Sequence, residues 1–187
     1  MGNVRARLRC SAELPVFLAA LCVVALASRA GGSGPHLASC RIGQLRLSVG
    51  PVWSEETGQH TATIVVRNHH TQPCVLDGYP TLALLTTHGR ELPFLYSHRG
   101  DQMITAARPT EVRLAADGTA YFAFNKYRCD LHELAIAHSL TVALPGRSAR
   151  RIVALRSRPT IDYCGRAGPS ALVAVSPFVR RLRDAGS

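Results

Sequence analysis

Apolar and polar residues alternate at every second position in several short stretches of this chain. In residues 44–49, Leu45, Leu47 and Val49 alternate with polar neighbours, and residues 61–67 and 120–125 repeat the pattern. Because successive side chains of a β-strand point to opposite faces of a sheet, this alternation predicts half-buried strands. Further short or apolar segments predict strands at 81–87, 112–114, 139–144, 150–156 and 172–175.

Turn-forming residues separate the predicted strands. They occur at Gly58-Gln59, Gly89-Arg90, Asp117-Gly118 and Pro145-Gly146. Many short strands joined by such turns indicate an all-β fold, an antiparallel β-sandwich. Residues 129–138 are the exception, because Leu131, Leu134 and Ala135 would share one face of a helix, which predicts one or two helical turns.

The N-terminal residues have the layout of a secretory signal peptide. Arg5, Arg7 and Arg9 precede an apolar run at 14–27, and Ser28-Arg29-Ala30 provides small residues for cleavage after Ala30. We therefore expect a signal peptide at 1–30, a short flexible lead at 31–39 and a domain at 40–178. An uncleaved signal anchor is the alternative, although the apolar run is shorter than the ~20 residues that span a bilayer.

A second possible membrane attachment is lipidation. Leu37-Ala38-Ser39-Cys40 resembles a lipobox, but a polar, glycine-rich gap separates it from the apolar run. Lipidation of Cys40 would also leave an odd number of cysteines, so we expect membrane contact only through an uncleaved signal or this less favoured anchor.

The chain is basic, with a formal net charge of +10 and a single lysine, Lys126. Such a charge favours adhesion to anionic lipid, polysaccharide or nucleic acid. The arginines are scattered apart from groups at 147–151 and 180–183, and no nucleic-acid recognition motif accompanies them, so a nucleic-acid role is not expected. We expect residues 179–187 to form a solvated basic tail.

Four cysteines follow the signal segment: Cys40, Cys74, Cys129 and Cys164. An even number in an exported chain predicts two disulfides. Residues 44–49 and 61–67 are expected to pair antiparallel, which leaves Cys40 and Cys74 at the open end of that pair. Cys129 and Cys164 flank a predicted hairpin of 139–144 and 150–156 in the same way. The predicted disulfides are therefore Cys40–Cys74 and Cys129–Cys164, in preference to a zinc site, which would favour a Cys-x-x-Cys pair.

The stretch 73–80 predicts a structural corner. Asp77 and Gly78 form a turn signal, and Pro80 disfavours the helical region for Tyr79, so the chain should leave the turn extended. Tyr79 should bury its ring and find a hydrogen-bond partner for its hydroxyl.

Several of these elements together resemble a known family. They are Cys40 before Leu45-Arg46-Leu47, Gly58-Gln59-His60 before a strand ending in Arg67-Asn68, the element Pro73-Cys74-Val75-Leu76-Asp77-Gly78-Tyr79-Pro80, the Gly89 turn, residues 109–114 and Cys129. The chain from Cys40 to about Pro177 resembles the secreted domain-of-unknown-function family 4232 of actinobacterial exported proteins and lipoproteins. The resemblance implies an immunoglobulin-like β-sandwich at the cell envelope, without catalytic residues.

Candidate chemistry is sparse. His69 and His70 lie in a turn where both rings could reach one metal, joined by His60 or His88, but no fixed ligand spacing supports a site. There is no Gly-x-Ser-x-Gly elbow and no phosphate or dinucleotide motif. Arg99-Gly100-Asp101 is the tripeptide that integrins read, although so short a motif also arises by chance.

The sequence thus predicts an exported, non-enzymatic β-sandwich domain without a cofactor, which binds an unknown partner at the cell envelope or outside the cell. The alternatives are a metal-binding protein that uses His69 and His70, and a hydrolase of unrecognised type.

Overall fold

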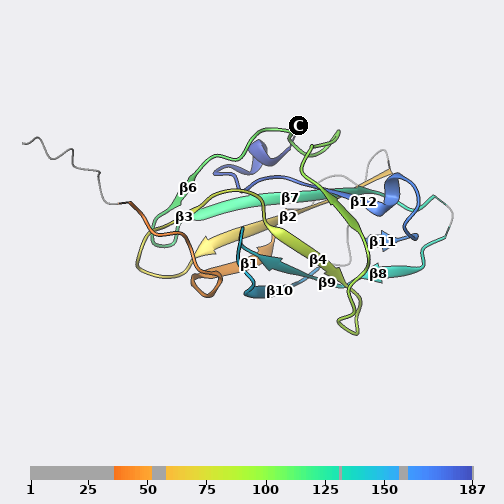
Figure 1. Ribbon diagram of the computed structural model, residues 1–187, viewed down its shortest axis with the longest axis horizontal. Helices are drawn as coiled ribbons and strands as arrows, with labels where there is room; N and C mark the ends of the chain where they lie inside the picture. Colours follow the sequence, from red (N-terminus) through yellow and green to blue (C-terminus); the bar gives the residue numbers. More distant parts are fainter. Residues whose placement is uncertain (1–35, 52–57, 131, 156–159, 187) are drawn as a thin grey trace, which may run out of the picture. The chain divides into compact units, whose positions relative to one another are not determined.

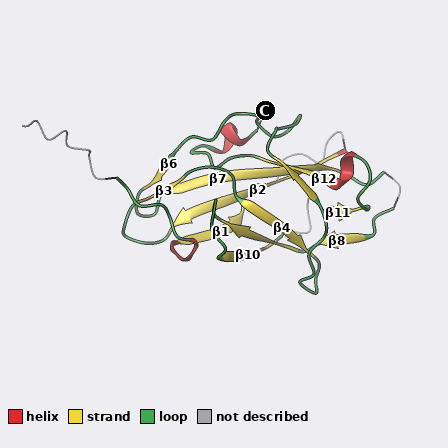
Figure 2. Ribbon diagram, viewed as in Figure 1, coloured by secondary structure: helices red, strands yellow, loops and turns green. Residues whose placement is uncertain are grey.

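The computed structural model describes residues 36–51, 58–130, 132–155 and 160–186. The predicted signal peptide lies outside the described residues. The described chain is all-β, and its helical content is limited to three short 3-10 segments (Figures 1 and 2): η1 (Ile42–Gln44), η3 (Pro169–Ala171) and η4 (Leu182–Ala185).

The larger sheet has five strands in the order β1-β2-β7-β12-β5. They are β1 (Leu45–Val49), β2 (Gln59–Asn68), β7 (Thr119–Tyr127), β12 (Leu172–Val175) and β5 (Leu95–Ser97). The predicted antiparallel pairing of the first two segments is confirmed, with Leu47 opposite Val66. β5 is the exception in this sheet, because it pairs parallel with β12.

The second sheet has three antiparallel strands in the order β10-β9-β4, and two shorter strand pairs complete the fold. The strands are β4 (Thr81–Leu85), β9 (Ser139–Ala143) and β10 (Arg150–Ala154), with the pairs β3 (Cys74–Leu76)–β6 (Val112–Leu114) and β8 (Ala135–Ala137)–β11 (Ile161–Tyr163). The hairpin predicted around Pro145-Gly146 is confirmed as β9–β10.

The strand order is that of an immunoglobulin-like sandwich. β1-β2-β7 corresponds to the A-B-E order and β4-β9-β10 to the C-F-G order of such domains. The place beside β7, where an immunoglobulin domain has strand D, holds the C-terminal strand β12 instead. The predicted fold class is therefore confirmed, with this difference at one sheet edge.

The main core lies between the inner faces of the two sheets. Ile64 and Phe122 of the larger sheet pack in one cluster with Leu84 and Leu140 of the smaller sheet, and all four are fully buried. The alternation in β7 explains this placement, because Ala120, Phe122 and Phe124 all face inward. By the same alternation, Lys126 is the next residue of β7 that faces inward.

A small second cluster contains residues from the other face of the larger sheet. It contains Ile104, Ala123, Ala174 and Ala185. Tyr121 and Val179 exchange two backbone hydrogen bonds of 2.9 and 2.8 Å, and Thr105 N donates to Ala185 O at 3.1 Å. The C-terminal segment therefore packs on the sheet through Val179 and Ala185, while Arg180, Arg181 and Arg183 are exposed as expected of a solvated stretch.

Three local predictions also differ from the structure. Residues 132–138 contain β8 rather than helical turns, because backbone pairing with β11 overrides the weak apolar spacing. The strand predicted at 81–87 ends at Leu85, where Thr86 begins a turn closed by Gly89. Residues 38–39, predicted as part of a flexible lead, are held by β3, since Val75 N donates to Ala38 O at 3.0 Å.

Candidate functional site

The two disulfides join the same cysteine pairs that the sequence topology predicts. Cys40–Cys74 has a Cα–Cα distance of 4.9 Å, and both residues are buried, at 3% and 1% exposed. Cys40 N also donates to Val75 O at 2.9 Å. This bridge therefore fixes the beginning of the domain to β3.

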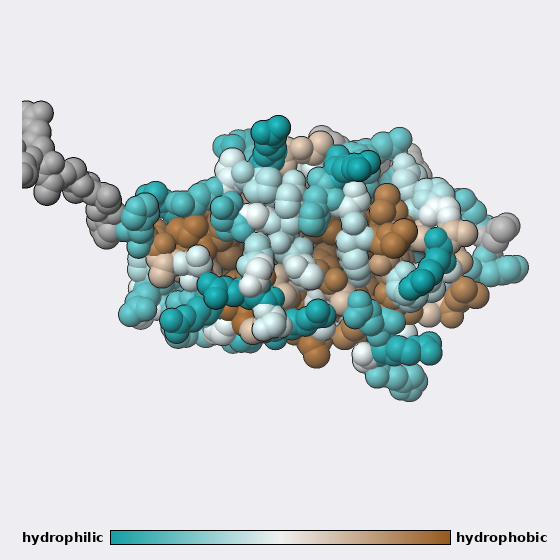
Figure 3. Space-filling model, in the orientation of Figure 1, coloured by the Kyte–Doolittle hydropathy of each residue, from teal (hydrophilic) through white to brown (hydrophobic). Residues whose placement is uncertain are grey.

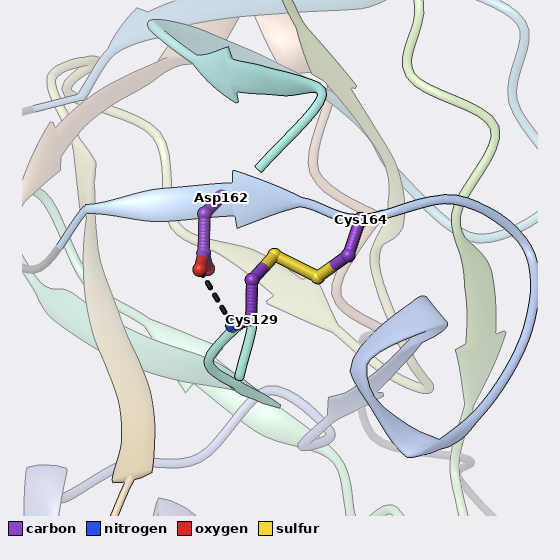
Figure 4. Close-up of side chains that lie close together, drawn as sticks. All are labelled: Cys129, Asp162 and Cys164. Carbon is purple, nitrogen blue, oxygen red and sulfur yellow. Dashed lines mark hydrogen bonds between the residues drawn. A yellow bond between two sulfur atoms is a disulfide. The ribbon is translucent and has the colours of Figure 1, made fainter. Parts of the chain in front are cut away.

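Cys129–Cys164, with a Cα–Cα distance of 5.7 Å, joins the chain after β7 to the end of β11 (Figure 4). Asp162 lies beside it, and its Oδ2 accepts a hydrogen bond of 2.6 Å from Cys129 N. The carboxylate and the two sulfurs lie within 4.8 Å of one another, a spacing that a metal site could use. Because the sulfurs are bonded to each other, neither is available as a thiolate ligand, and the arrangement is a structural junction.

Asp162 also forms a buried ion pair inside the sandwich. Lys126 Nζ donates to Asp162 Oδ1 and to its backbone oxygen, each at 2.6 Å, and Lys126 is 1% exposed. The ammonium group lies 5.9 Å from the centre of the Phe94 ring. His60 Nδ1 lies 3.2 Å from Asp162 Oδ1, in a contact too poorly aligned for a full hydrogen bond.

The environment shifts the pKa values of both partners. Burial lowers the pKa of Lys126 below its usual range, although Asp162 opposes that shift. Burial acts to raise the pKa of Asp162, but contacts with His60, Lys126 and Cys129 N together outweigh burial and lower it. Asp162 is therefore ionised at neutral pH.

Titratable groups with shifted pKa values can mark an active site, but this cluster is closed. The side chains of Lys126 and Asp162 are 0% and 8% exposed, so a substrate has no access to the pair. The donors around Asp162 instead connect β11 to β7 and to Cys129, which lies two residues beyond the end of β7. The cluster is thus a structural network of polar contacts that holds β7, β11 and Cys129 together.

An open site is provided by a groove of about 590 Å³, which we call the lateral groove. One wall is the turn after β4, and the other is β8 with the residues just before it. Its lining residues are Thr86, Thr87, His88, Arg90, Glu133, Leu134, Ala135, Ile136 and His138.

Both walls of the lateral groove are held by backbone hydrogen bonds. Thr86 N donates to Arg90 O at 2.9 Å, which closes the turn, and His138 N donates to Leu85 O at 2.8 Å. On the other wall Leu134 N donates to Tyr163 O at 2.7 Å, next to the Cys129–Cys164 bridge. The disulfide and the buried ion pair therefore hold the wall that carries Leu134.

The lateral groove combines an apolar centre with polar groups. Leu134 is 70% exposed, the highest value among the large apolar side chains of the described residues that are exposed. His88, Arg90, Glu133 and His138 supply donors and acceptors around it. The turn after β4 projects from the domain (Figure 1), and the space-filling view shows this region as mainly hydrophilic (Figure 3).

The predicted corner has a mainly structural role. Gly78 has a φ of 93°, which a residue with a side chain rarely adopts, and its carbonyl accepts from Phe178 N at 3.1 Å. Tyr79 is half-buried rather than buried and stacks on His98, with ring centres 4.0 Å apart. Its hydroxyl donates only weakly, at 3.3 Å to Ala107 O. Burial lowers the pKa of His98.

The histidines singled out by the sequence do not come together as a metal site. His69 and His70 have ring centres 5.0 Å apart, and His69 Nε2 lies 3.0 Å from Gly43 O. His60 is instead beside Asp162, and His88 is in the lateral groove. Within the described chain, the Cys129, Asp162 and Cys164 group is the one set with metal-like spacing.

The carboxylate of Asp101, in the Arg99-Gly100-Asp101 tripeptide, forms its hydrogen bonds within the domain. Asp101 Oδ1 accepts from Met103 N and Ile104 N at 2.7 and 2.8 Å. Its Oδ2 accepts from the buried Asn125 side chain at 2.8 Å. The carboxylate that an integrin would bind is therefore used internally.

Sequence reasoning missed the lateral groove and the buried ion pair. The groove joins residues far apart in the sequence and follows from no local motif. The inward position of Lys126 could have been found, because it continues the alternation of Ala120, Phe122 and Phe124. Asp162 could not have been identified as its partner without the β8–β11 pairing.

No helix in the described part of the chain is long and apolar enough to cross a membrane. The fold and its disulfides define a two-disulfide β-sandwich domain. A family model described as "Domain of unknown function (DUF4232)" matches residues 40–178, and the chain belongs to this family. No curated protein and no solved structure matches the chain.

Proposed function

We propose that this protein is an exported, non-enzymatic binding domain, and that it holds a partner of the cell envelope or the extracellular space in the lateral groove. The exposure of Leu134 carries the proposal. A single exposed apolar residue on an open surface needs no explanation, but an apolar side chain that lines a groove together with a few polar groups is typical of a binding site.

The position of Leu134 on a fixed segment strengthens this argument. Hydrogen bonding to Tyr163 and the nearby Cys129–Cys164 bridge oppose a collapse of the segment that would bury the side chain. The surrounding polar groups would orient a partner that places an apolar group on Leu134. We infer a protein or peptide partner, since such surfaces combine an apolar centre with polar groups at the rim.

Export is supported by the signal-like N-terminus and by the two disulfides, which form and persist in oxidising compartments. The absence of catalysis is supported by the closed burial of the Lys126–Asp162 pair. Neither argument depends on the identity of the partner.

Site-specific photocrosslinking tests the proposal. A photoreactive amino acid in place of Glu133, inside the lateral groove, should give covalent adducts of discrete mass in cells that produce the protein. The same probe in place of Glu111, an exposed glutamate next to β6 that does not line the groove, is the matched control. Leu134→Asp should remove the adducts formed from position 133.

The expected affinity change can be measured once a crosslinked partner is identified. Burial of a leucine side chain contributes about 1.5–3 kcal/mol, so Leu134→Ala should weaken binding by about tenfold or more. Adducts that are equal at positions 133 and 111, or that persist in Leu134→Asp, would show that the lateral groove is not the binding site.

A further inference from the structure

Two segments of the domain contain arginines but no acidic residues. Residues 36–51 and 139–155 contain Arg41, Arg46, Arg147, Arg150 and Arg151 but no aspartate or glutamate. β1 and β10, which belong to these segments, lie next to each other although they are edge strands of different sheets. This side of the domain therefore carries a concentrated positive charge.

Several arginines elsewhere in the domain pair with acids, whereas the two acid-free segments offer their arginines no such partner. Arg67 lies 2.9 Å from Asp117, and Arg113 lies 2.8 Å from Glu111. None of the five arginines in the two acid-free segments forms an ion pair with a described residue. All five side chains are exposed, so their guanidinium groups are accessible to an external anion.

Two of these arginines line one groove, which we call the basic groove. It has a volume of about 470 Å³ and is formed by residues 38–43, Arg147 and Ala149. One wall is fixed by the buried Cys40–Cys74 bridge. The other is the β9–β10 turn, in which Arg147 N donates to Leu144 O at 3.0 Å. Arg41 and Arg147 thus come from separate, well-anchored elements.

We propose that the basic groove binds a phosphate-bearing polymer. Guanidinium groups bind phosphate through paired, charge-assisted hydrogen bonds. Arg150 follows Ala149 directly and extends the charge beyond the groove along β10. Charge spread along a strand suits a repeating polyanion better than a single small ion. This site is separate from the lateral groove, so either proposal can fail alone.

Asp77 gives an internal check on the electrostatic argument. It lines a smaller neighbouring cavity of about 100 Å³ together with Arg147 and is the only acidic residue in the lining of either cavity. Its charge should oppose anion binding at Arg147. Asp77→Asn should therefore tighten binding, by about twofold for a solvent-exposed charge.

The direct test measures binding of fluorescently labelled inorganic polyphosphate by anisotropy at low ionic strength. The variant Arg41→Gln/Arg147→Gln should bind about tenfold more weakly than the natural chain. The matched control is Arg67→Gln/Arg113→Gln, which loses the same charge at ion-paired positions and should change binding less than twofold. If the two variants lose equal amounts of affinity for polyphosphate, the effect is due to net charge alone, and this result would overturn the proposal.

Two further probes identify the ligand chemistry. Polyglutamate carries one negative charge per repeat, as the internal units of polyphosphate do, so it separates phosphate chemistry from charge alone and should compete weakly. Vesicles that contain phosphatidylglycerol should bind no better to the natural chain than to Arg41→Gln/Arg147→Gln. Equal competition by polyglutamate would overturn the phosphate assignment. Binding to vesicles that depends on Arg41 and Arg147, without binding to polyphosphate, would assign the groove to a membrane surface instead. Thermal unfolding of each variant establishes that it is folded.

Discussion

Lys126, the only lysine of the chain, lies in the interior and contacts an aspartate that is 36 residues away. A buried ion pair is not in itself strongly stabilising, because both charges lose their hydration. Its effect appears when one partner is removed and the other remains buried without compensation. At this site the same carboxylate also accepts from Cys129 N, so its loss would affect two contacts between elements.

Asp162→Asn should therefore lower the free energy of unfolding at neutral pH by about 3–5 kcal/mol, the usual cost of breaking a buried pair. The folded-state pKa of Asp162 lies below its unfolded value of about 3.9. Its contribution is thus fully present above that pH and is lost as the pH falls toward the folded pKa. Urea unfolding between pH 2 and pH 7 should show a shallower acid decline in the variant.

Asp117→Asn is the control for this experiment. Asp117 pairs with Arg67 at the surface, with side chains 72% and 54% exposed, and such pairs contribute about 0–1 kcal/mol. If the natural chain and Asp162→Asn lose stability in parallel as the pH falls, Asp162 does not carry the acid sensitivity.

At the scale of elements, strands were predictable where one face is buried. β1, β2, β7 and the β9–β10 hairpin follow directly from period-two alternation and from Pro145-Gly146. β8 was not predictable, because its pairing with β11 joins residues on either side of the hairpin. The packing of the C-terminal segment was not predicted, because its arginines are exposed and the contacts come from Val179 before them and Ala185 after them.

The packing of this segment can be tested at Ala185, which is 0% exposed. Ala185→Asp should destabilise the domain by about 2–4 kcal/mol, because it buries a charge without a partner. Arg183→Ala, two residues earlier and with a side chain 75% exposed, should change stability by less than about 0.5 kcal/mol. Chemical denaturation measures both. Equal, small effects would restore the interpretation of 179–186 as a solvated tail.

At the scale of the whole molecule, the two disulfides serve different regions. Cys40–Cys74 is buried and anchors the beginning of the sandwich beside the basic groove. Cys129–Cys164 is half-buried and anchors the segment that leads to the lateral groove. The sequence separations of 34 and 35 residues are nearly equal, so loop-closure entropy assigns each bridge about 3.8 kcal/mol. Access to the sulfurs is what distinguishes them.

We therefore expect the two bridges to break in a fixed order. Reduction requires a thiolate to approach a disulfide sulfur, so mild reductant should open Cys129–Cys164 before Cys40–Cys74. Alkylation followed by peptide mass spectrometry should first label Cys129 and Cys164, while a fragment that joins Cys40 to Cys74 persists. Circular dichroism should change little at that stage, because neither the five-stranded nor the three-stranded sheet includes β8 or β11, whereas crosslinking from position 133 should fall. A fragment joining Cys74 to Cys129, or earlier labelling of Cys40, would contradict both the pairing and the division of roles.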